Sequence, residues 1–162
     1  MYAVAPDWSR GCRRPTRGLH SSVLRVVLDT NVLVAGLRSR TGASFAVLDH
    51  VANGRLVPVL NLPLAEEYAE VLARPAQHAV HGVDAVEVDA FVQGLLAVGH
   101  LVATRLQERI LLRRDPSDGG VVEAALDGGA NRLVTHNLKH SDEVADRISV
   151  VTPAQLLRII TQ

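Results

Sequence analysis

Acidic side chains stand at positions where the apolar pattern of this sequence calls for hydrophobic residues. Asp29 directly follows the apolar run VLRVVL at 23–28, so we expect it at the carboxyl end of a buried strand. In open α/β folds, ligands bind at that edge of the sheet. Capping of the next helix is the alternative role for an aspartate after a strand. We favour a role in binding.

A second carboxylate, Glu67, falls on the predicted buried face of a helix over 62–74. Leu64, Tyr68 and Val71 are spaced i, i+4 and i+7 and define that face, and Glu67 lies on it at i+3. A carboxylate facing the core is costly unless a cation or hydrogen bonds compensate its charge. Glu67 therefore needs a partner, unless it lies at the margin of the face and reaches solvent along its stem.

A third carboxylate lies in the stretch RDPSDGGVVEAAL at 114–126. Asp115 is predicted to cap a helix with Pro116 at its first position, which places Asp118 in the first turn, where negative charge favours the helix dipole. Asp118 also shares a face with apolar residues at i+3, i+4 and i+7. We therefore expect its side chain to face inward while serving the helix start.

Asn137 lies just beyond a predicted strand at 131–135 and offers one more oxygen at a carboxyl end. Oxygen ligands from strand ends and helix starts suit Mg²⁺ or Mn²⁺. Such ions activate water for in-line attack on a phosphodiester. A zinc site is disfavoured because the closely spaced histidines lack a third ligand nearby. We interpret both pairs as surface residues: His78 with His81, and His136 with His140.

Alternating apolar runs and amphipathic stretches must position these side chains. The predicted strands are 23–28, 55–60, 100–104, 131–135 and 148–152. The predicted helices are 43–52, 62–74, 83–99, about 116–128, and 153–161. This alternation predicts an α/β fold with a mostly parallel sheet and helices on both faces.

Three polar or proline positions refine this prediction. Thr30 and Asn31 follow Asp29, and either could cap the next helix. Pro58, inside the predicted strand 55–60, suggests an edge strand or a bulge.

The composition favours one soluble domain. A chain of 162 residues suits a single core, and 48% hydrophobic with only 3% aromatic residues means a core of Val, Leu, Ile and Ala. No apolar stretch approaches the roughly 20 residues that cross a bilayer, so we expect no membrane association. Cys12 is the single cysteine, which excludes an internal disulfide and is typical of the cytoplasm.

Residues 1–22 differ from the remainder because they are basic, contain Pro, Gly and Ser, and follow neither helix nor strand periodicity. We expect a flexible extension without function, followed by the domain at 23–162. A basic arm that contacts nucleic acid is the alternative.

Four segments in collinear order resemble the PIN-domain family, and the resemblance spans about residues 24–160. They are VVLDTNVLVAGL at 26–37, EYAEVLARP at 67–75, RDPSDGGVVEAALDGGANRLVTHNLKH at 114–140 and VVTPAQLLRII at 150–160. The branch it is most similar to is the VapC-type toxins of toxin–antitoxin systems. The resemblance implies a five-stranded parallel sheet between helices, an acidic pocket for Mg²⁺ or Mn²⁺, and endonucleolytic cleavage of RNA by metal-activated water.

By matching position, the resemblance implies that the catalytic, metal-binding acids are Asp29, Glu67 and Asp118, with Asn137 at the fourth metal position. The family often has aspartate at the fourth position, so asparagine removes one negative charge and weakens binding of a second metal.

The resemblance also implies supporting roles around these acids. Thr30 and Asn31 would orient the first aspartate through hydrogen bonds, and Asp115 would support the site from outside the metal's ligands. Gly119 and Gly120 replace residues that are commonly polar or acidic, which loosens the helix start.

The leading functional hypothesis is a ribonuclease toxin, silenced by a cognate antitoxin whose cationic side chain fills the acidic pocket, and active as a homodimer. A catalytically weak or inactive PIN-like module that binds RNA or protein is the alternative, and cleavage of DNA or flaps stays open. A phosphate-binding regulator is disfavoured because no Gly-rich loop follows the first strand. Candidate contacts to RNA phosphates are arginines near one helical turn apart: Arg105, Arg109, Arg113 and Arg114.

Overall fold

A sheet of five parallel strands forms the centre of the chain. The computed structural model describes residues 23–103, 119–138 and 147–161, and the description is confined to them. The strands are β1 (Leu24–Leu28), β2 (Leu56–Leu60), β3 (His100–Leu101), β4 (Arg132–Val134) and β5 (Ser149–Val151). Their order across the sheet is β3-β2-β1-β4-β5, and every pairing is parallel. This confirms the predicted five-stranded parallel α/β fold.

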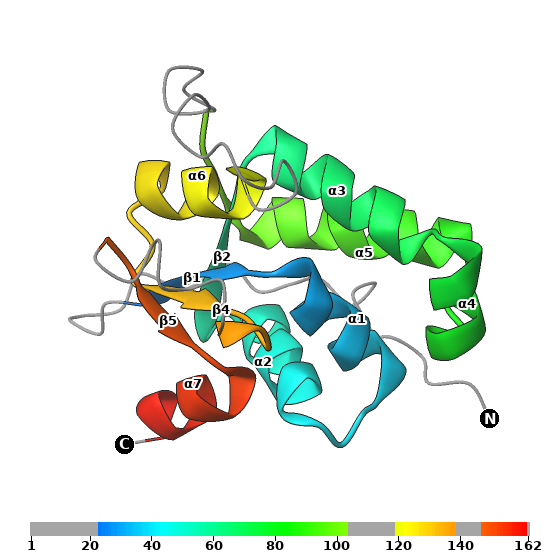
Figure 1. The fold of residues 1–162 in the computed structure, drawn as a ribbon, viewed down its shortest axis with the longest axis horizontal. Helices are drawn as coiled ribbons and strands as arrows, with labels where there is room; N and C mark the ends of the chain where they lie inside the picture. Colours follow the sequence, from blue (N-terminus) through cyan, green and yellow to red (C-terminus); the bar gives the residue numbers. More distant parts are fainter. Residues whose placement is uncertain (1–22, 104–118, 139–146, 162) are drawn as a thin grey trace.

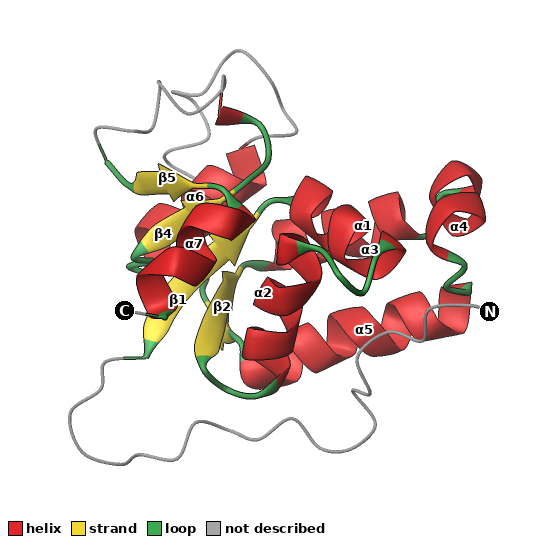
Figure 2. Cartoon of the chain, turned by 90° about the horizontal axis from the view of Figure 1, so that it is seen from below, coloured by secondary structure: helices red, strands yellow, loops and turns green. Residues whose placement is uncertain are grey.

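Helices cover both faces of the sheet. They are α1 (Thr30–Arg38), α2 (Ala43–Ala52), α3 (Leu62–Leu72), α4 (Pro75–His81), α5 (Ala85–Val98), α6 (Gly119–Asp127) and α7 (Pro153–Ile160). Helices α3, α5 and α6 lie on one side of the sheet, with α2 and α7 on the other (Figures 1 and 2). Among the described helices, none combines the length and apolar character needed to cross a membrane.

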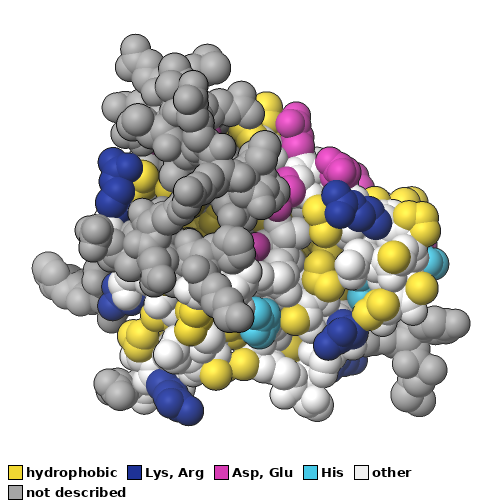
Figure 3. All heavy atoms as spheres, viewed as in Figure 1, with side chains coloured by type: hydrophobic (Ala, Val, Ile, Leu, Met, Phe, Trp, Pro, Cys, Tyr) yellow, Lys and Arg dark blue, Asp and Glu magenta, His cyan; other side chains and the backbone are white. Residues whose placement is uncertain are grey.

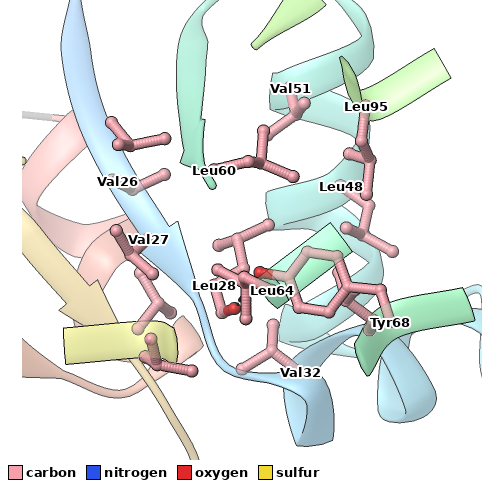
Figure 4. Close-up of a cluster of buried hydrophobic side chains, with 14 of the residues drawn as sticks. Val26, Val27, Leu28, Val32, Leu48, Val51, Leu60, Leu64, Tyr68 and Leu95 are labelled. Carbon is pink, nitrogen blue, oxygen red and sulfur yellow. Dashed lines mark hydrogen bonds between the residues drawn. The ribbon is translucent and has the colours of Figure 1, made fainter. Parts of the chain in front are cut away.

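The core is built around β1, whose residues Val26, Val27 and Leu28 are at most 1% exposed. Burial on both faces is what a central parallel strand requires, and it explains the three consecutive apolar residues at 26–28, which follow the exposed Arg25. Figure 4 shows Leu28 close to Leu64 and Tyr68 of α3, with Val27 and Val26 further along the strand. The core is almost wholly aliphatic, as the composition predicts.

Local sequence signals fix where helices begin. The Asn61 side chain accepts from a backbone N–H in the first turn of α3. Asp84 and Glu87 form a reciprocal capping box at α5, and Thr152 and Gln155 form another at α7. Such caps satisfy backbone donors that have no partner inside the helix.

The edge-strand interpretation of Pro58 was wrong. Strand β2 lies between β3 and β1, and Pro58 pairs in register with Val26. Strand β3 pairs only with Val59 and Leu60. The Leu60 carbonyl accepts from the Val102 N–H, so Leu60 directs its backbone groups toward the β3 side of β2. Because this direction alternates along a strand, Pro58, two residues earlier, directs its backbone groups toward the same side. The backbone nitrogen of Pro58, which has no hydrogen to donate, therefore lies where the short strand β3 does not extend.

Helix α4 was not predicted, because Pro75 reads as the end of the preceding helix. Pro75 does follow α3, yet it also occupies the first turn of α4, a position that proline favours. His81 is 3% exposed and bonds to the Leu72 carbonyl and the Val83 N–H, so its interpretation as a surface residue was wrong. His78 is exposed, as predicted.

Candidate active site

The candidate site lies where the order of strands reverses along the chain. Strands β2 and β3 extend the sheet to one side of β1, and β4 and β5 extend it to the other. The connections after β1 and β4 therefore diverge, which opens a crevice at their carboxyl ends, where open α/β sheets bind ligands. Asp29 is the first residue after β1, and Thr135 is the first after β4.

One oxygen of Asp29 is held tightly. Its Oδ2 accepts from Asn31 Nδ2 at 2.7 Å and from Thr135 Oγ1 at 2.5 Å, whereas no described donor reaches Oδ1. Asp29 occupies the N-cap position of α1, but its side chain makes no capping bond. Thr30 and Asn31 lie within the first turn of α1, so the expectation that one of them caps this helix was wrong.

Thr135 is the centre of this hydrogen-bond network, and the sequence reasoning missed it. Its hydroxyl is buried, and it lies 3.2 Å from Asn31 Nδ2 and 3.0 Å from the Asn137 N–H. Both of these neighbours are donors, so the one hydroxyl proton goes to Asp29. The signal that could have found Thr135 is a hydroxyl side chain directly after a buried strand.

The orientation of Asn31 follows from the same network. The His136 N–H donates to Asn31 Oδ1 at 3.2 Å, which leaves the Asn31 amide protons to Asp29 and Thr135. His136 itself is exposed, and its Nε2 lies 2.7 Å from Ser44 Oγ at the start of α2. The turn after β4 is therefore tied to both α1 and α2.

Glu67 is the second carboxylate at this edge. It is half-buried on α3, while Glu66 and Glu70 on the same helix are exposed, as the helical spacing predicts. Thr30 Oγ1, itself buried, donates to Glu67 Oε1 at 2.6 Å. The structure thus places Thr30 against Glu67, whereas the resemblance implied that it orients Asp29.

Tyr68 follows Glu67 on α3 and contacts the strand end that precedes Asp29. Its phenol is buried and donates to the Leu28 carbonyl, one residue before Asp29. Burial raises the pKa of Tyr68 well above its usual value, and the negative charges of Asp29 and Glu67 raise it further. Both carboxylates therefore lie near enough to the Tyr68 phenol for their charges to act on it.

Asn61 connects the start of α6 to this edge of the sheet through a hydrogen bond. It is fully buried at the end of β2, with Oδ1 accepting from the Leu64 N–H at 2.9 Å and Nδ2 donating to the Gly120 carbonyl at 3.2 Å. The first turn of α6 therefore lies beside the first turn of α3, one turn before Glu67. The sequence reasoning did not single out Asn61.

The remaining candidates are distributed as follows. Asn137 is exposed, and its backbone N–H bonds to Thr135, which places the residue at the same sheet edge. Within the described ranges, no three His, Cys, Asp or Glu side chains form a metal-binding group. The other predicted site residues lie outside those ranges: Asp115, Asp118, Arg105, Arg109, Arg113 and Arg114.

The donor chemistry fits a hard divalent cation. Asp29 and Glu67 supply carboxylate oxygens from two elements, and Mg²⁺ and Mn²⁺ favour such ligands. The asymmetry of Asp29, with Oδ2 doubly hydrogen-bonded and Oδ1 without a described donor, leaves one oxygen for a ligand. A third oxygen donor would have to come from outside these two residues.

A family model described as PIN domain matches residues 25–139, which is more than half of the chain. The chain belongs to the PIN domain family. No curated protein matches the sequence. Among solved structures, this PIN domain is similar to a chain in the crystal structure of VapBC2 from Rickettsia felis bound to a DNA fragment from their promoter. That likeness has a TM-score of 0.52 at 12% identity, covering 80% of this chain and 98% of that one, and it supports the fold.

The charges of this PIN domain are unevenly arranged on the face shown in Figure 3. Acidic side chains run from the upper edge toward the middle of the face, and basic and histidine side chains lie beside and below them. Acidic and basic side chains are therefore both present on this face.

Proposed function

We propose that this PIN domain is a metal-dependent endoribonuclease, the toxin of a toxin–antitoxin pair. The observation that carries the proposal is the convergence of Asp29 and Glu67, from two elements, at the crevice between β1 and β4, in a family of nucleases. Each acid is held by a buried hydroxyl, Thr135 for Asp29 and Thr30 for Glu67. Buried hydroxyls held against carboxylates are typical of pre-organised sites.

In this proposal Asp29, Glu67 and Asp118 hold Mg²⁺ or Mn²⁺, with Asn137 as a further oxygen donor. When bound, such an ion supplies an activated water and neutralises the charge that develops at phosphorus. Thr135 and Asn31 fix the Asp29 carboxylate, and Thr30 fixes that of Glu67, so neither acid must reorganise when RNA arrives. The Tyr68 phenol adds no third negative charge beside them near neutral pH, and burial raises its pKa further from that range.

The test compares neutralised acids with matched surface controls. Asp29→Asn and Glu67→Gln are assayed on a mixed single-stranded RNA in EDTA, Mg²⁺ or Mn²⁺, beside Asp49→Asn on α2 and Glu66→Gln on α3, both of which are exposed. We expect metal-dependent cleavage that falls by at least about 100-fold in the first two variants, since even supporting residues of metal sites cost 10–100-fold. The controls should keep full activity.

Cleavage that persists in EDTA, or that survives both Asp29→Asn and Glu67→Gln, would refute the metal-dependent mechanism. No cleavage of any RNA by the wild-type protein, with metal binding intact, would favour the module that binds without cutting. Adding single- and double-stranded DNA as substrates separates an RNase from a nuclease of the same fold that acts on DNA.

The antitoxin and the homodimer are parts of the same proposal. An acidic crevice of this kind is neutralised most directly by an arginine or lysine of a partner, and the VapBC2 structure of Rickettsia felis is a complex of that named pair. Co-expression with a small reading frame encoded beside this one should relieve growth arrest if that frame is the antitoxin. Sedimentation of the purified chain measures whether it dimerises.

A further inference from the structure

A pocket lies along α1, and its lining includes Thr30 and Asn31, the hydrogen-bond partners of the two carboxylates, but neither carboxylate itself. It has a volume of about 340 Å³, within the size range of small-ligand sites. Thr30 and Asn31, which hold Glu67 and Asp29, form the end of the pocket nearest the acids. Val71 lines the pocket one helical turn after Glu67, on the same face of α3.

The wall of the pocket is apolar in its middle part. Val34 and Ala35 of α1 and Val71 of α3 line it there, and all three are half-buried. Aliphatic surfaces of this kind hold the flat face of a nucleobase when no aromatic side chain is present. Leucine or phenylalanine here would fill the space, so the small side chains are what keep the pocket open.

Polar groups stand at the end of the pocket away from the acids. Gln77 of α4 lines it, and an amide both donates and accepts hydrogen bonds, as the edge of a base does. Arg38 lines it from the last turn of α1, about 12 Å from Thr30 along the helix axis. Arg74 pairs with Glu70 at 3.0 Å, whereas Arg38 has no carboxylate partner within the described ranges.

We propose that this pocket binds one nucleotide of the RNA next to the bond that is cut. In this arrangement Val34, Ala35 and Val71 hold the base, Gln77 reads its edge, and Arg38 binds the phosphate on the far side. The scissile phosphate then lies at Asp29 and Glu67. The proposal rests on the nuclease function above and deepens it, because it assigns base preference to α1 and α4.

A cleavage experiment tests the reading of the base. A randomised single-stranded RNA is cut with Mn²⁺ present, and the junctions are sequenced for the wild type, Gln77→Leu and the control Gln93→Leu on the exposed face of α5. We expect Gln77→Leu to lower the base preference at one position beside the junction by roughly tenfold, since a base-edge contact contributes about 1–3 kcal/mol. Gln93→Leu should leave the junction profile unchanged.

A binding experiment tests the pocket without requiring turnover. The probe is a fluorescein-labelled single-stranded RNA of random sequence in EDTA, measured by anisotropy at several salt concentrations. Arg38→Gln should weaken binding several-fold and lower the salt slope by about one, as loss of one phosphate contact does. The control is Arg158→Gln, an arginine in the last turn of α7, which should change neither quantity.

The two experiments separate the two proposals. If the protein cleaves no RNA but Arg38→Gln weakens RNA binding, the nuclease proposal is refuted and the nucleotide pocket is supported. If Gln77→Leu cleaves normally at identical junctions and Arg38→Gln binds RNA as the wild type does, the nucleotide pocket is refuted and the nuclease proposal is supported. A wild-type protein that binds no RNA would overturn the pocket, which would then suit a protein partner.

Discussion

Replacing Thr135 by valine tests whether the hydrogen-bond network really organises the site. Valine keeps the shape and removes the hydroxyl, which donates to Asp29 and accepts from Asn31 and the Asn137 N–H. The bond to an ionised carboxylate contributes about 1.5–3 kcal/mol, and water can replace the hydroxyl at exposed Asn137. We expect a net loss of about 2 kcal/mol in the free energy of unfolding, or roughly 4–8 °C in Tm for a chain of this size.

The loss should be larger in the presence of metal. A partner that orients a metal-ligating carboxylate contributes 10- to 100-fold in affinity. At a saturating Mn²⁺ concentration, the stabilisation of the folded state by the ion should therefore shrink by about 1.4–2.7 kcal/mol. Differential scanning fluorimetry without Mn²⁺ measures the loss of stability, and the same measurement with Mn²⁺ gives the stabilisation by the ion. RNA cleavage against Mn²⁺ concentration measures the affinity for the metal.

Thr135→Ser restores the hydroxyl and should recover most of the metal response, while the exposed Thr161→Val is the control for loss of a hydroxyl elsewhere. An unchanged Mn²⁺-dependent shift in Thr135→Val would refute the reasoning, because Asp29 would then be held without its closest partner. Equal losses in the valine and serine variants would point to packing as the cause.

Three further predictions follow from the fold. The raised pKa of Tyr68 means that the native state holds this proton above pH 10 while the unfolded state releases it, so the free energy of unfolding should fall as pH rises above about 10. Urea denaturation from pH 8 to 11 measures this fall in the wild type and in Tyr68→Phe. The same dependence on pH in both proteins would contradict the prediction. Gly128→Ala should destabilise the fold by about 1–3 kcal/mol in urea, because its Cβ would lie 2.1 Å from Val59 Cγ1; a neutral effect would show that β2 moves aside. Asp84→Ala should cost about 1 kcal/mol by removing the cap of α5, with Asp89→Ala on the same helix as control, and equal effects would refute the capping argument.

Much of the fold could be read from periodicity, because most elements carry their own signals. The helix over 43–52 was predicted with its observed bounds, and the strand after residue 23 was placed to within one residue. Sheet position was harder to predict. Whether Pro58 lies at an edge depends on the length of β3, a distant segment that begins at His100.

The site was less predictable than the fold, since its contacts join distant residues. Helical spacing placed Glu67 inward, and strand-end position placed Asp29 at the crevice. Neither pattern could show that Thr30 bonds to Glu67 or that Thr135 bonds to Asp29, because both bonds cross between elements. The burial of His81 escaped for the same reason: its partners belong to the end of α3 and to the segment before α5.

Asp29 and Thr135 stand 106 positions apart in the sequence, which decides when the site is completed. At translation rates of 5–20 residues per second, the carboxylate is made about 5–20 s before the hydroxyl that holds it. Contacts this far apart in sequence also form late in folding, because a long loop must close first. For the proposed nuclease, the growing chain on the ribosome lacks an assembled centre. A neutralising partner therefore has only the finished molecule to capture, and a protein cut short before β4 should be harmless to the cell that makes it.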